Sequence, residues 1–260
     1  MIDLHTHILP GLDDGPHSPE AALAMAARAA AYGVTTIVAT PHVMPGVYDN
    51  PPGRILEAVD RLNKRLEAGG VAVRVLPGAE YYFDDDLPRR LARGELLTIN
   101  RGSCLLLEFP GQSVPLPALR VLFDLLMAGV RPVLAHPERN AVLAQKPDLV
   151  YDLVSRGVLL QVTAASLVGG FGRTAALAAE LYVRQGWAQL IASDAHNPGE
   201  RITAMGGVKG RITALAGTET AALLTRHNPR AVLDGDMVTV EAAPPPGDRD
   251  YFPLWRRLLK

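Results

Sequence analysis

Two histidines stand one residue apart near the beginning of the chain, in the stretch MIDLHTHILPGLDDG. Apolar and polar residues alternate around them, so residues 1–7 are predicted to form a β-strand, in which residues i and i+2 point to the same face. His5 and His7 would then project together. Two imidazoles at that spacing can bind one metal ion, provided that other side chains complete its coordination.

Further histidines and acidic residues occur where other apolar segments end. They are Asp13 and Asp14 in the loop after the first strand, His42 after VTTIVAT, Glu80 in VRVLPGAE, Glu108 in CLLLEF, His136 in RPVLAH, and Asp194 and His196 after AQLIAS. The carboxyl ends of parallel strands meet at one end of a barrel or an open α/β sheet, and sites form there. The pattern therefore predicts a metal site built from distant parts of the chain.

The number and type of these residues narrow the chemistry. The nine candidate ligands are His5, His7, Asp14, His42, Glu80, Glu108, His136, Asp194 and His196. A catalytic zinc ion takes about three protein ligands plus water, so this set suits two or three ions. Imidazole and carboxylate without thiolate fit manganese, iron or zinc better than magnesium or calcium alone. Ions about 3.5–4 Å apart are typical of phosphoester and amide hydrolysis.

Two arginines favour a phosphate substrate. Three divalent ions would leave the site positive even with four carboxylates among the ligands. Arg139 lies three residues after His136, and Arg201 lies five residues after His196. An isolated arginine is more often in a surface ion pair, but beside two ligand motifs it is better placed to bind a phosphate dianion.

Seven apolar segments alternate with helical patterns, which predicts a parallel α/β fold. The predicted strands are 1–7, 34–40, 73–80, 104–109, 131–136, 158–163 and 188–193. The predicted helices are 18–32, 54–68, 84–93, 115–128, 147–156, 173–185 and 208–226. Strand pattern alone leaves a barrel and an open sheet as alternatives. The glycine-rich stretches GGFG and MGGVKG lack the Lys-Ser/Thr of a P-loop and are predicted to be loops.

Composition narrows the classes of partner and compartment. The 260 residues include 26 Lys+Arg and 27 Asp+Glu, so no basic excess predicts nucleic-acid or membrane binding. The single cysteine cannot form an intramolecular disulfide. The sequence also lacks a signal-peptide pattern and any apolar run of about 18 residues. We therefore expect a cytoplasmic protein.

Cysteine-phosphatase chemistry is disfavoured, because it needs an arginine six positions after the thiolate, where this chain has Pro110 after Cys104. Cys104 is predicted to be a core residue. Tyr81, Tyr82 and Phe83 either line a pocket for a phenyl ring or pack in the core. Asp13 either orients a ligand or supports the DDG turn.

The ordered motifs HTH with DDG, TPH, GAE, HPER and SDAH resemble the polymerase-and-histidinol-phosphatase (PHP) superfamily. More narrowly, DLHTHILPGLDDGP, GAEYY, LLEF, AHPERN and ASDAHN resemble bacterial capsule and exopolysaccharide protein-tyrosine phosphatases, over about residues 1–233. The resemblance implies a distorted seven-stranded TIM-like (β/α)7 barrel at 1–235. Residues 236–260 form a tail without a counterpart, expected to pack on the domain or to contact a second copy in a homo-oligomer.

The resemblance also implies three metal sites and their ligands. One ion is bound by His5, His7, Glu80 and Asp194; Glu80 bridges to a second, bound by Glu108 and His136; Asp14, His42 and His196 bind the third. The metal implied is most often manganese, with iron or zinc as alternatives. Arg139 and Arg201 match phosphate-binding arginines.

The function implied is a metal-dependent protein-tyrosine phosphatase that acts on the C-terminal tyrosines of a cognate bacterial tyrosine kinase controlling polysaccharide export. A water or hydroxide between two ions would attack phosphorus in line, and His42 or His196 would protonate the leaving phenolate. The alternatives are a small-molecule phosphatase such as a histidinol-phosphate phosphatase, and a metal-binding scaffold without turnover. An amidohydrolase is disfavoured, because no lysine ends a predicted strand to serve as the carbamylated ligand common in that class.

Overall fold

The computed structural model describes residues 1–246. Its strands are β1 (Ile2–Thr6), β2 (Thr36–Ala39), β3 (His42–Val43), β4 (Arg74–Pro77), β5 (Glu80–Tyr82), β6 (Cys104–Glu108), β7 (Arg131–Ala135), β8 (Leu159–Thr163) and β9 (Leu190–Ala192). Its α-helices are α1 (Pro19–Ala31), α2 (Pro52–Ala68), α3 (Leu87–Ala92), α4 (Ala118–Met127), α5 (Pro147–Ser155), α6 (Ala164–Leu167), α7 (Gly172–Arg184), α8 (Glu200–Ala222) and α9 (Asn228–Asp234). Short 3-10 helices lie at Ile99–Arg101, Pro137–Arg139 and Leu143–Gln145, and a π-helical turn lies at Leu223–His227.

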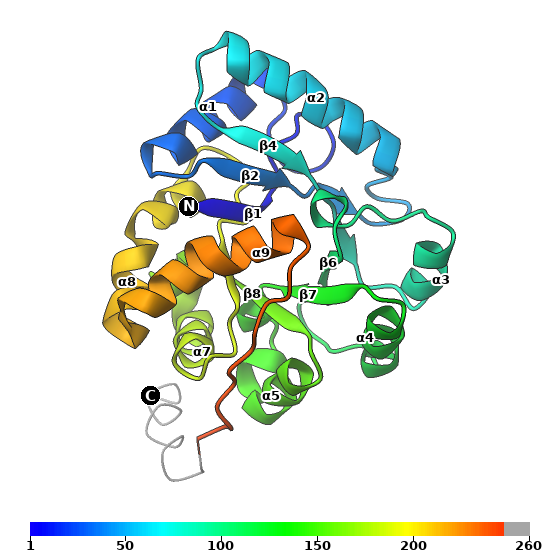
Figure 1. The fold of residues 1–260 in the computed structure, drawn as a ribbon, viewed down its shortest axis with the longest axis vertical. Coiled ribbons are helices and arrows are strands. Elements are labelled where there is room, and N and C mark those ends of the chain that lie inside the picture. The colour runs from blue at the N-terminus through cyan, green and yellow to red at the C-terminus, as the bar shows by residue number, and fades with distance from the viewer. Residues whose placement is uncertain (247–260) are drawn as a thin grey trace.

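All strand pairs between neighbouring strands are parallel, as predicted. The strands form a three-stranded sheet, β1-β2-β4, and a six-stranded sheet, β3-β5-β6-β7-β8-β9. Helices surround the two sheets, with α1 and α2 beside β1, β2 and β4, and α4, α5 and α7 beside the larger sheet (Figure 1). The alternation of short apolar strands with amphipathic helices produces this arrangement, because each strand needs cover on both faces.

Two predicted strands differ from the structure in their extent. The predicted strand 34–40 contains β2, and a further short strand, β3, follows after Pro41, which has no backbone N–H to donate to a ladder. The predicted strand 73–80 is divided at Gly78 into β4 and the start of β5. A Cβ atom on Gly78 would lie 2.8 Å from the side chain of Val38, so the chain at Gly78 lies close against β2.

The sheet pairing differs from a closed seven-stranded barrel. β1 and β9 belong to different sheets, and the end of β1 meets the segment after β9 at an isolated parallel bridge between Thr6 and Ala195. Two backbone hydrogen bonds support it, from Asp194 to the His5 carbonyl and from His7 to the Ala195 carbonyl, both 2.9 Å. The structure therefore has two parallel sheets in contact, without a continuous ladder between them.

Two apolar layers hold the strands in place. A larger layer packs the strands against the surrounding helices and includes the fully buried Trp187 and Tyr182. A smaller cluster lies among the strands and reaches α9; its members include Leu4, Val38, Leu106, Val133, Leu159, Leu190, Val232 and Leu233. In Figure 1, α9 crosses in front of the strands. This inner cluster fixes the strands whose carboxyl ends carry the candidate ligands.

The glycine-rich stretch MGGVKG (205–210) is helical, so the loop prediction was wrong there. It lies inside α8, which begins at Glu200, eight residues before the predicted start. A Cβ on Gly206 would lie 2.5 Å from the ring of Tyr32, so glycine allows α8 to approach α1 closely. The GGFG stretch does form the turn between α6 and α7, where Gly169 and Gly172 have positive φ.

The described part of the tail packs against the domain. Arg131 donates to the Val238 carbonyl (2.7 Å), Trp187 Nε1 donates to the Ala243 carbonyl (2.7 Å), and the Ala243 amide donates to the Gln185 carbonyl (2.9 Å). Residues 247–260, the rest of the predicted tail, lie outside the described residues. No helix within residues 1–246 is long and apolar enough to cross a membrane.

Candidate metal centre

His5 and His7 project together from the end of β1, as their spacing predicts. Their Nε2 atoms lie 3.2 Å apart, and Glu80 Oε2 at the start of β5 lies 3.1 Å from one and 3.2 Å from the other. Asp194 Oδ1, just after β9, lies 3.4 and 3.3 Å from the same two nitrogens. All four side chains are buried, and one ligand atom from each lies within 4.8 Å of the others. They form the first group of candidate ligands.

The other ring nitrogen of each histidine has its own partner. His5 Nδ1 donates to Gln161 Oε1 in β8 (2.7 Å), and His7 Nδ1 donates to Asp13 Oδ2 (2.6 Å). Such hydrogen bonds select the tautomer with a free lone pair on Nε2 and hold the ring in orientation for a metal. Gln161 was missed by sequence reasoning. The signal for it was a single amide side chain inside the apolar strand VLLQVT.

Asp13 fulfils both alternatives considered for it. Its Oδ2 also accepts from the His42 backbone amide (2.9 Å), and its Oδ1 accepts from the Gly15 amide (3.0 Å). One carboxylate thus orients the His7 ring, closes the DDG turn and fixes the backbone at the next candidate ligand.

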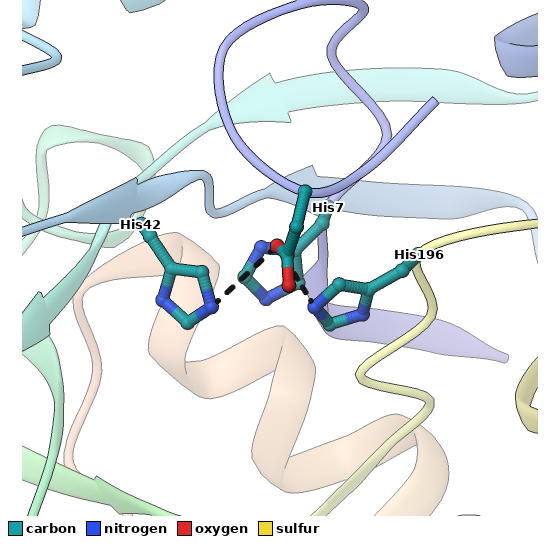
Figure 2. Close-up of side chains that lie close together, drawn as sticks. His7, His42 and His196 are labelled. Carbon is teal, nitrogen blue, oxygen red and sulfur yellow. Dashed lines mark ion pairs between the residues drawn. The ribbon is translucent and has the colours of Figure 1, made fainter. Parts of the chain in front are cut away.

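A second group contains His7, Asp14, His42 and His196, whose ligand atoms also lie within 4.8 Å of one another. Asp14 Oδ1 lies 3.3 Å from His196 Nε2 and 3.8 Å from His42 Nε2. Figure 2 shows the three imidazoles of this group around a common space. His7 therefore belongs to both the first and the second group.

The third group is His42, Glu80 and Glu108. His42 Nδ1 lies 3.1 Å from Glu80 Oε2 and 3.5 Å from Glu108 Oε1. His136 Nε2 faces the same two carboxylates, 3.0 Å from Glu80 Oε1 and 3.7 Å from Glu108 Oε2. The resemblance places His42 with the third ion only, whereas here its two ring nitrogens face two different groups. All nine predicted ligands lie in this one cluster.

The donor set and two buried polar atoms fit divalent metal ions. Glu80 Oε2 and His42 Nδ1 lie 3.1 Å apart, and neither makes a well-directed hydrogen bond within the described structure. Buried polar atoms without such a hydrogen bond are costly, and a cation among them would compensate that cost. Oxygen and imidazole donors without thiolate are the set that manganese, iron and zinc accept.

Two candidate ligands have strained backbones. His136 has φ 34° and Asp194 has φ 52°, in the left-handed region that non-glycine residues rarely adopt. His136 follows β7 directly and Asp194 comes two residues after β9, and the His136 amide donates to the Gln161 carbonyl (2.8 Å). Strain of this kind costs about 1–3 kcal/mol per residue and tends to occur at functional sites.

Opposite charges shift the pKa values of the buried residues. Burial alone would raise the pKa of the Glu80 and Asp194 carboxyls, but the imidazole of His5 and its neighbours hold both well below the usual value. Burial likewise opposes a charge on His7, but hydrogen bonds to Asp13 and Asp194 raise its pKa well above the usual value.

At the edge of the cluster the pKa of a carboxyl group is raised and the pKa of an imidazole is lowered. Burial and the nearby charge of Glu80 raise the pKa of Glu108 to about 7. Burial and the charge of His7 lower the pKa of His196 to about 4. The metal-free cluster thus holds protons at neutral pH, and bound ions would displace them.

Arg139 and Arg201 lie beside the cluster, as predicted. Arg139 donates a short hydrogen bond to Asp194 Oδ2, and Arg201 donates to the same oxygen at 3.0 Å. Both guanidinium groups lie over the ring of Phe171, with Cζ 4.4 Å and 5.0 Å from its centroid. Sequence reasoning treated Phe171 only as part of a glycine-rich loop.

The other residues considered have structural surroundings. Tyr81 is fully buried and its hydroxyl accepts from the Leu97 amide (2.7 Å), while Phe83 packs edge-on against Phe109. Core packing therefore explains Tyr81 and Phe83. Cys104 is buried in β6, as predicted, and burial raises the pKa of its thiol.

Glu138 was not singled out from the HPER motif. It is buried and accepts hydrogen bonds from the Thr163 amide (3.0 Å) and the Ser166 hydroxyl (2.7 Å). It thereby ties the turn that carries His136 and Arg139 to the end of β8.

The chain is similar to known proteins over most of its length. The family model "Capsular polysaccharide synthesis, CpsB/CapC" matches residues 1–234. The tyrosine-protein phosphatase YwqE of Bacillus subtilis (strain 168) is 42% identical over 197 residues, covering 76% of this chain and 78% of the relative. The tyrosine-protein phosphatase CpsB of Streptococcus pneumoniae is 29% identical over 243 residues, covering 92% of this chain and 100% of the relative.

Solved structures show the same relationship. A structure from work on YwqE and CpsB, described as unique metal-dependent tyrosine phosphatases, superposes with a TM-score of 0.91 at 36% identity, covering 95% of this chain and 100% of that one. Histidinol phosphate phosphatase of Lactococcus lactis superposes with a TM-score of 0.53 at 12% identity, covering 86% of this chain and 95% of that one. The second likeness concerns the fold alone.

Proposed function

Because the chain belongs to the CpsB/CapC family of capsular polysaccharide synthesis, we propose that it is a metal-dependent tyrosine phosphatase whose active site is the cluster at the carboxyl ends of its strands. The observation that carries the proposal is the overlap of three ligand groups through His7, His42 and Glu80, with two arginines beside them. Shared ligands hold neighbouring ions close together, and two-metal sites with ions at close separation serve phosphoester hydrolysis.

The ligands divide among three positions. His5, His7, Glu80 and Asp194 would hold one ion, Glu80, Glu108 and His136 a second, and Asp14, His42 and His196 a third, with His42 also facing the second position. The metal proposed is manganese, with iron or zinc as alternatives, because the donors are oxygen and imidazole. Bound ions would activate water for attack on phosphorus and offset negative charge on the phosphoryl oxygens.

The arginines are proposed to bind the phosphoryl group. Arg139 and Arg201 now share the carboxylate of Asp194, and their side chains are 27% and 30% exposed, so the guanidinium groups can be reached from solvent. If Asp194 binds a metal, its carboxylate oxygens attract the two arginines less strongly. The arginines can then donate hydrogen bonds to a phosphate instead. They would stabilise the equatorial oxygens in the transition state.

His42 and His196 are better suited to hold metal than to act as general acids. Burial and the charge of His7 lower the pKa of His196 to about 4, and burial also lowers the pKa of His42. Both rings are therefore neutral at pH 7, which is the form that binds a metal. Phenolate is a moderate leaving group, so hydrolysis of a tyrosyl ester does not require a strong protein acid.

The proposed substrate is phosphotyrosine on a protein, specifically the C-terminal tail of a cognate bacterial tyrosine kinase, in the cytoplasm. The names of the relatives support tyrosine phosphatase activity, and the family description supports a role in capsule synthesis. The distorted seven-stranded barrel at 1–235 is also a proposal; it is supported by the Thr6–Ala195 bridge between the two sheets and by the apolar cluster among the strands.

The test is phosphotyrosine-peptide hydrolysis by chelated protein before and after manganese is restored. We expect activity to disappear on chelation, to return with metal, and to survive in Cys104→Ala. Histidinol phosphate is the control substrate, and we expect it to be hydrolysed far more slowly. Activity that persists without metal and is lost in Cys104→Ala would contradict the proposal, and an inactive metal-loaded protein would indicate a binding scaffold.

A further inference from the structure

A groove of about 720 Å³ opens beside the metal centre, and the proposed function does not account for it. It lies between α6, the α6–α7 turn and the first turns of α8, and Arg28 of α1 also lines it. Most of its lining residues are apolar or glycine, among them Val168, Phe171 and Gly207.

The groove is continuous with the proposed active site. Phe171 and Arg201 both line it, and Arg201 also donates to the carboxylate of Asp194. The Phe171 ring lies against the guanidinium groups of both Arg139 and Arg201. A phosphoryl group bound by these arginines would therefore have its ester next to Phe171, at the entrance of the groove.

The groove is also lined by a second arginine, which belongs to α1. Arg28 of α1 is exposed, and its guanidinium donates to Thr203 Oγ1 (2.9 Å). Arg28 makes no ion pair with any residue of the described chain. Glu200 is an acidic residue in the lining, so Arg28 and Arg201 leave the groove with a net positive charge.

We propose that this groove binds the polypeptide segment that flanks the phosphotyrosine, with an apolar side chain against Phe171 and Val168 and an acidic side chain at Arg28. The proposal rests on the proposed tyrosine phosphatase function and defines its substrate more narrowly. A small ester such as p-nitrophenyl phosphate is too short to occupy the groove, whereas a phosphopeptide fills it. Changes in the groove should therefore alter KM for phosphopeptides but not KM for small esters.

The first test compares three substrates of the manganese-loaded, full-length protein. They are p-nitrophenyl phosphate, a phosphotyrosine peptide with leucine and glutamate on each side of the phosphotyrosine, and the same peptide with glutamine in place of glutamate. We expect Arg28→Glu to raise KM for the glutamate peptide about three- to fivefold, the upper part of the range of an exposed ion pair because the charge is reversed, and to leave KM for the small ester unchanged. Arg61→Glu on α2, another exposed arginine, is the control with the same change of charge.

The second test fills the groove. Gly207 lines the groove and a Cβ atom there meets no atom within 4 Å, so Gly207→Leu adds a side chain to the groove with its first atom unobstructed. Gly210, one turn farther along α8, is equally open but is not a lining residue, so Gly210→Leu is the matched control. We expect Gly207→Leu to raise KM for both peptides and to weaken binding of a non-hydrolysable phosphonate peptide, while kcat for p-nitrophenyl phosphate stays unchanged. Gly210→Leu should change none of these quantities.

The outcomes distinguish failure of the groove proposal from failure of the proposed function. Unchanged peptide KM in both Arg28→Glu and Gly207→Leu overturns the proposal that the groove binds the peptide. A parallel loss with p-nitrophenyl phosphate also overturns it, because the residues would then act on the fold or on the chemistry. If the metal-loaded wild-type protein hydrolyses p-nitrophenyl phosphate but no phosphotyrosine peptide, the proposed function itself fails.

Discussion

Replacing Asp13 with asparagine tests whether the structure prepares His7 for a metal ion. The Asp13 carboxylate receives three hydrogen bonds, from His7 Nδ1 (2.6 Å), the His42 amide (2.9 Å) and the Gly15 amide (3.0 Å). Asparagine keeps the shape but has one oxygen. If that oxygen faces His7 and His42, the amide nitrogen must face the Gly15 N–H, and two donors meet.

The substitution therefore removes the negative charge behind His7 and one hydrogen bond of the turn. Loss of an outer partner of a metal ligand typically weakens metal affinity about 10- to 100-fold, or about 1.4–2.7 kcal/mol. A smaller effect opposes it. Asp13 raises the pKa of His7 in the metal-free protein, so Asp13→Asn makes the imidazole easier to deprotonate. We expect the loss to lie nearer tenfold than 100-fold for this reason.

The assay is manganese affinity, measured by competition with a chelator, together with the manganese concentration that gives half-maximal hydrolysis. Asp49→Asn is the matched control, because Asp49 Oδ1 accepts from the Gly46 amide (3.1 Å) in a similar turn that has no ligand histidine. Equal manganese affinity in wild type and Asp13→Asn would refute the orienting role of Asp13. Equal losses in both variants would show that turn geometry alone is responsible.

Three further predictions concern pH and stability. Manganese affinity should fall as pH decreases from 8 to 6, because the pKa of Glu108 is about 7 in the metal-free protein and its carboxyl group must be deprotonated to bind the ion. Calorimetric titration at each pH checks this, and a pH-independent Kd would contradict it. Gly206→Ala should lower the free energy of unfolding by about 1–3 kcal/mol through a clash with Tyr32, whereas Gly210→Ala should stabilise α8, and thermal melting that ranks them the other way would disprove the packing. Cys104→Ala should cost about 1 kcal/mol or more of stability by opening a cavity but leave the metal-loaded kcat unchanged, and a kcat loss would revive thiolate chemistry.

The convergence of the ligands follows from the parallel order of the strands. His5 lies near the end of β1, Glu80 follows β4 and begins β5, and His136 and Asp194 follow β7 and β9. Parallel strands bring such positions together whether or not the sheet closes. The strand pattern therefore predicts that these residues converge, as they do in the structure, but it leaves a barrel and an open sheet as alternatives. The seven-stranded barrel was implied by the resemblance alone, and the observed pairing forms two sheets instead. The same reasoning did not find the short strand β3, because two residues after Pro41 give no apolar pattern of their own.

The misses depend on contacts that no local pattern encodes. MGGVKG forms part of α8 because Gly206 packs on Tyr32, which is far away in sequence. Phe171 matters because a turn after α6 brings its ring to two arginines. Gln161 differs from them, since an amide in an apolar strand was visible in the sequence.

The central claim is that shared ligands hold several ions together, and metal content measures it most directly. Metal-loaded wild-type protein should contain two or three manganese ions per chain after dialysis. Glu80→Gln changes the one carboxylate that belongs to two ligand groups, so a folded variant should lose more than one ion together with phosphotyrosine hydrolysis. A wild-type protein with at most one ion, or a Glu80→Gln variant with full metal content and full activity, would contradict the account.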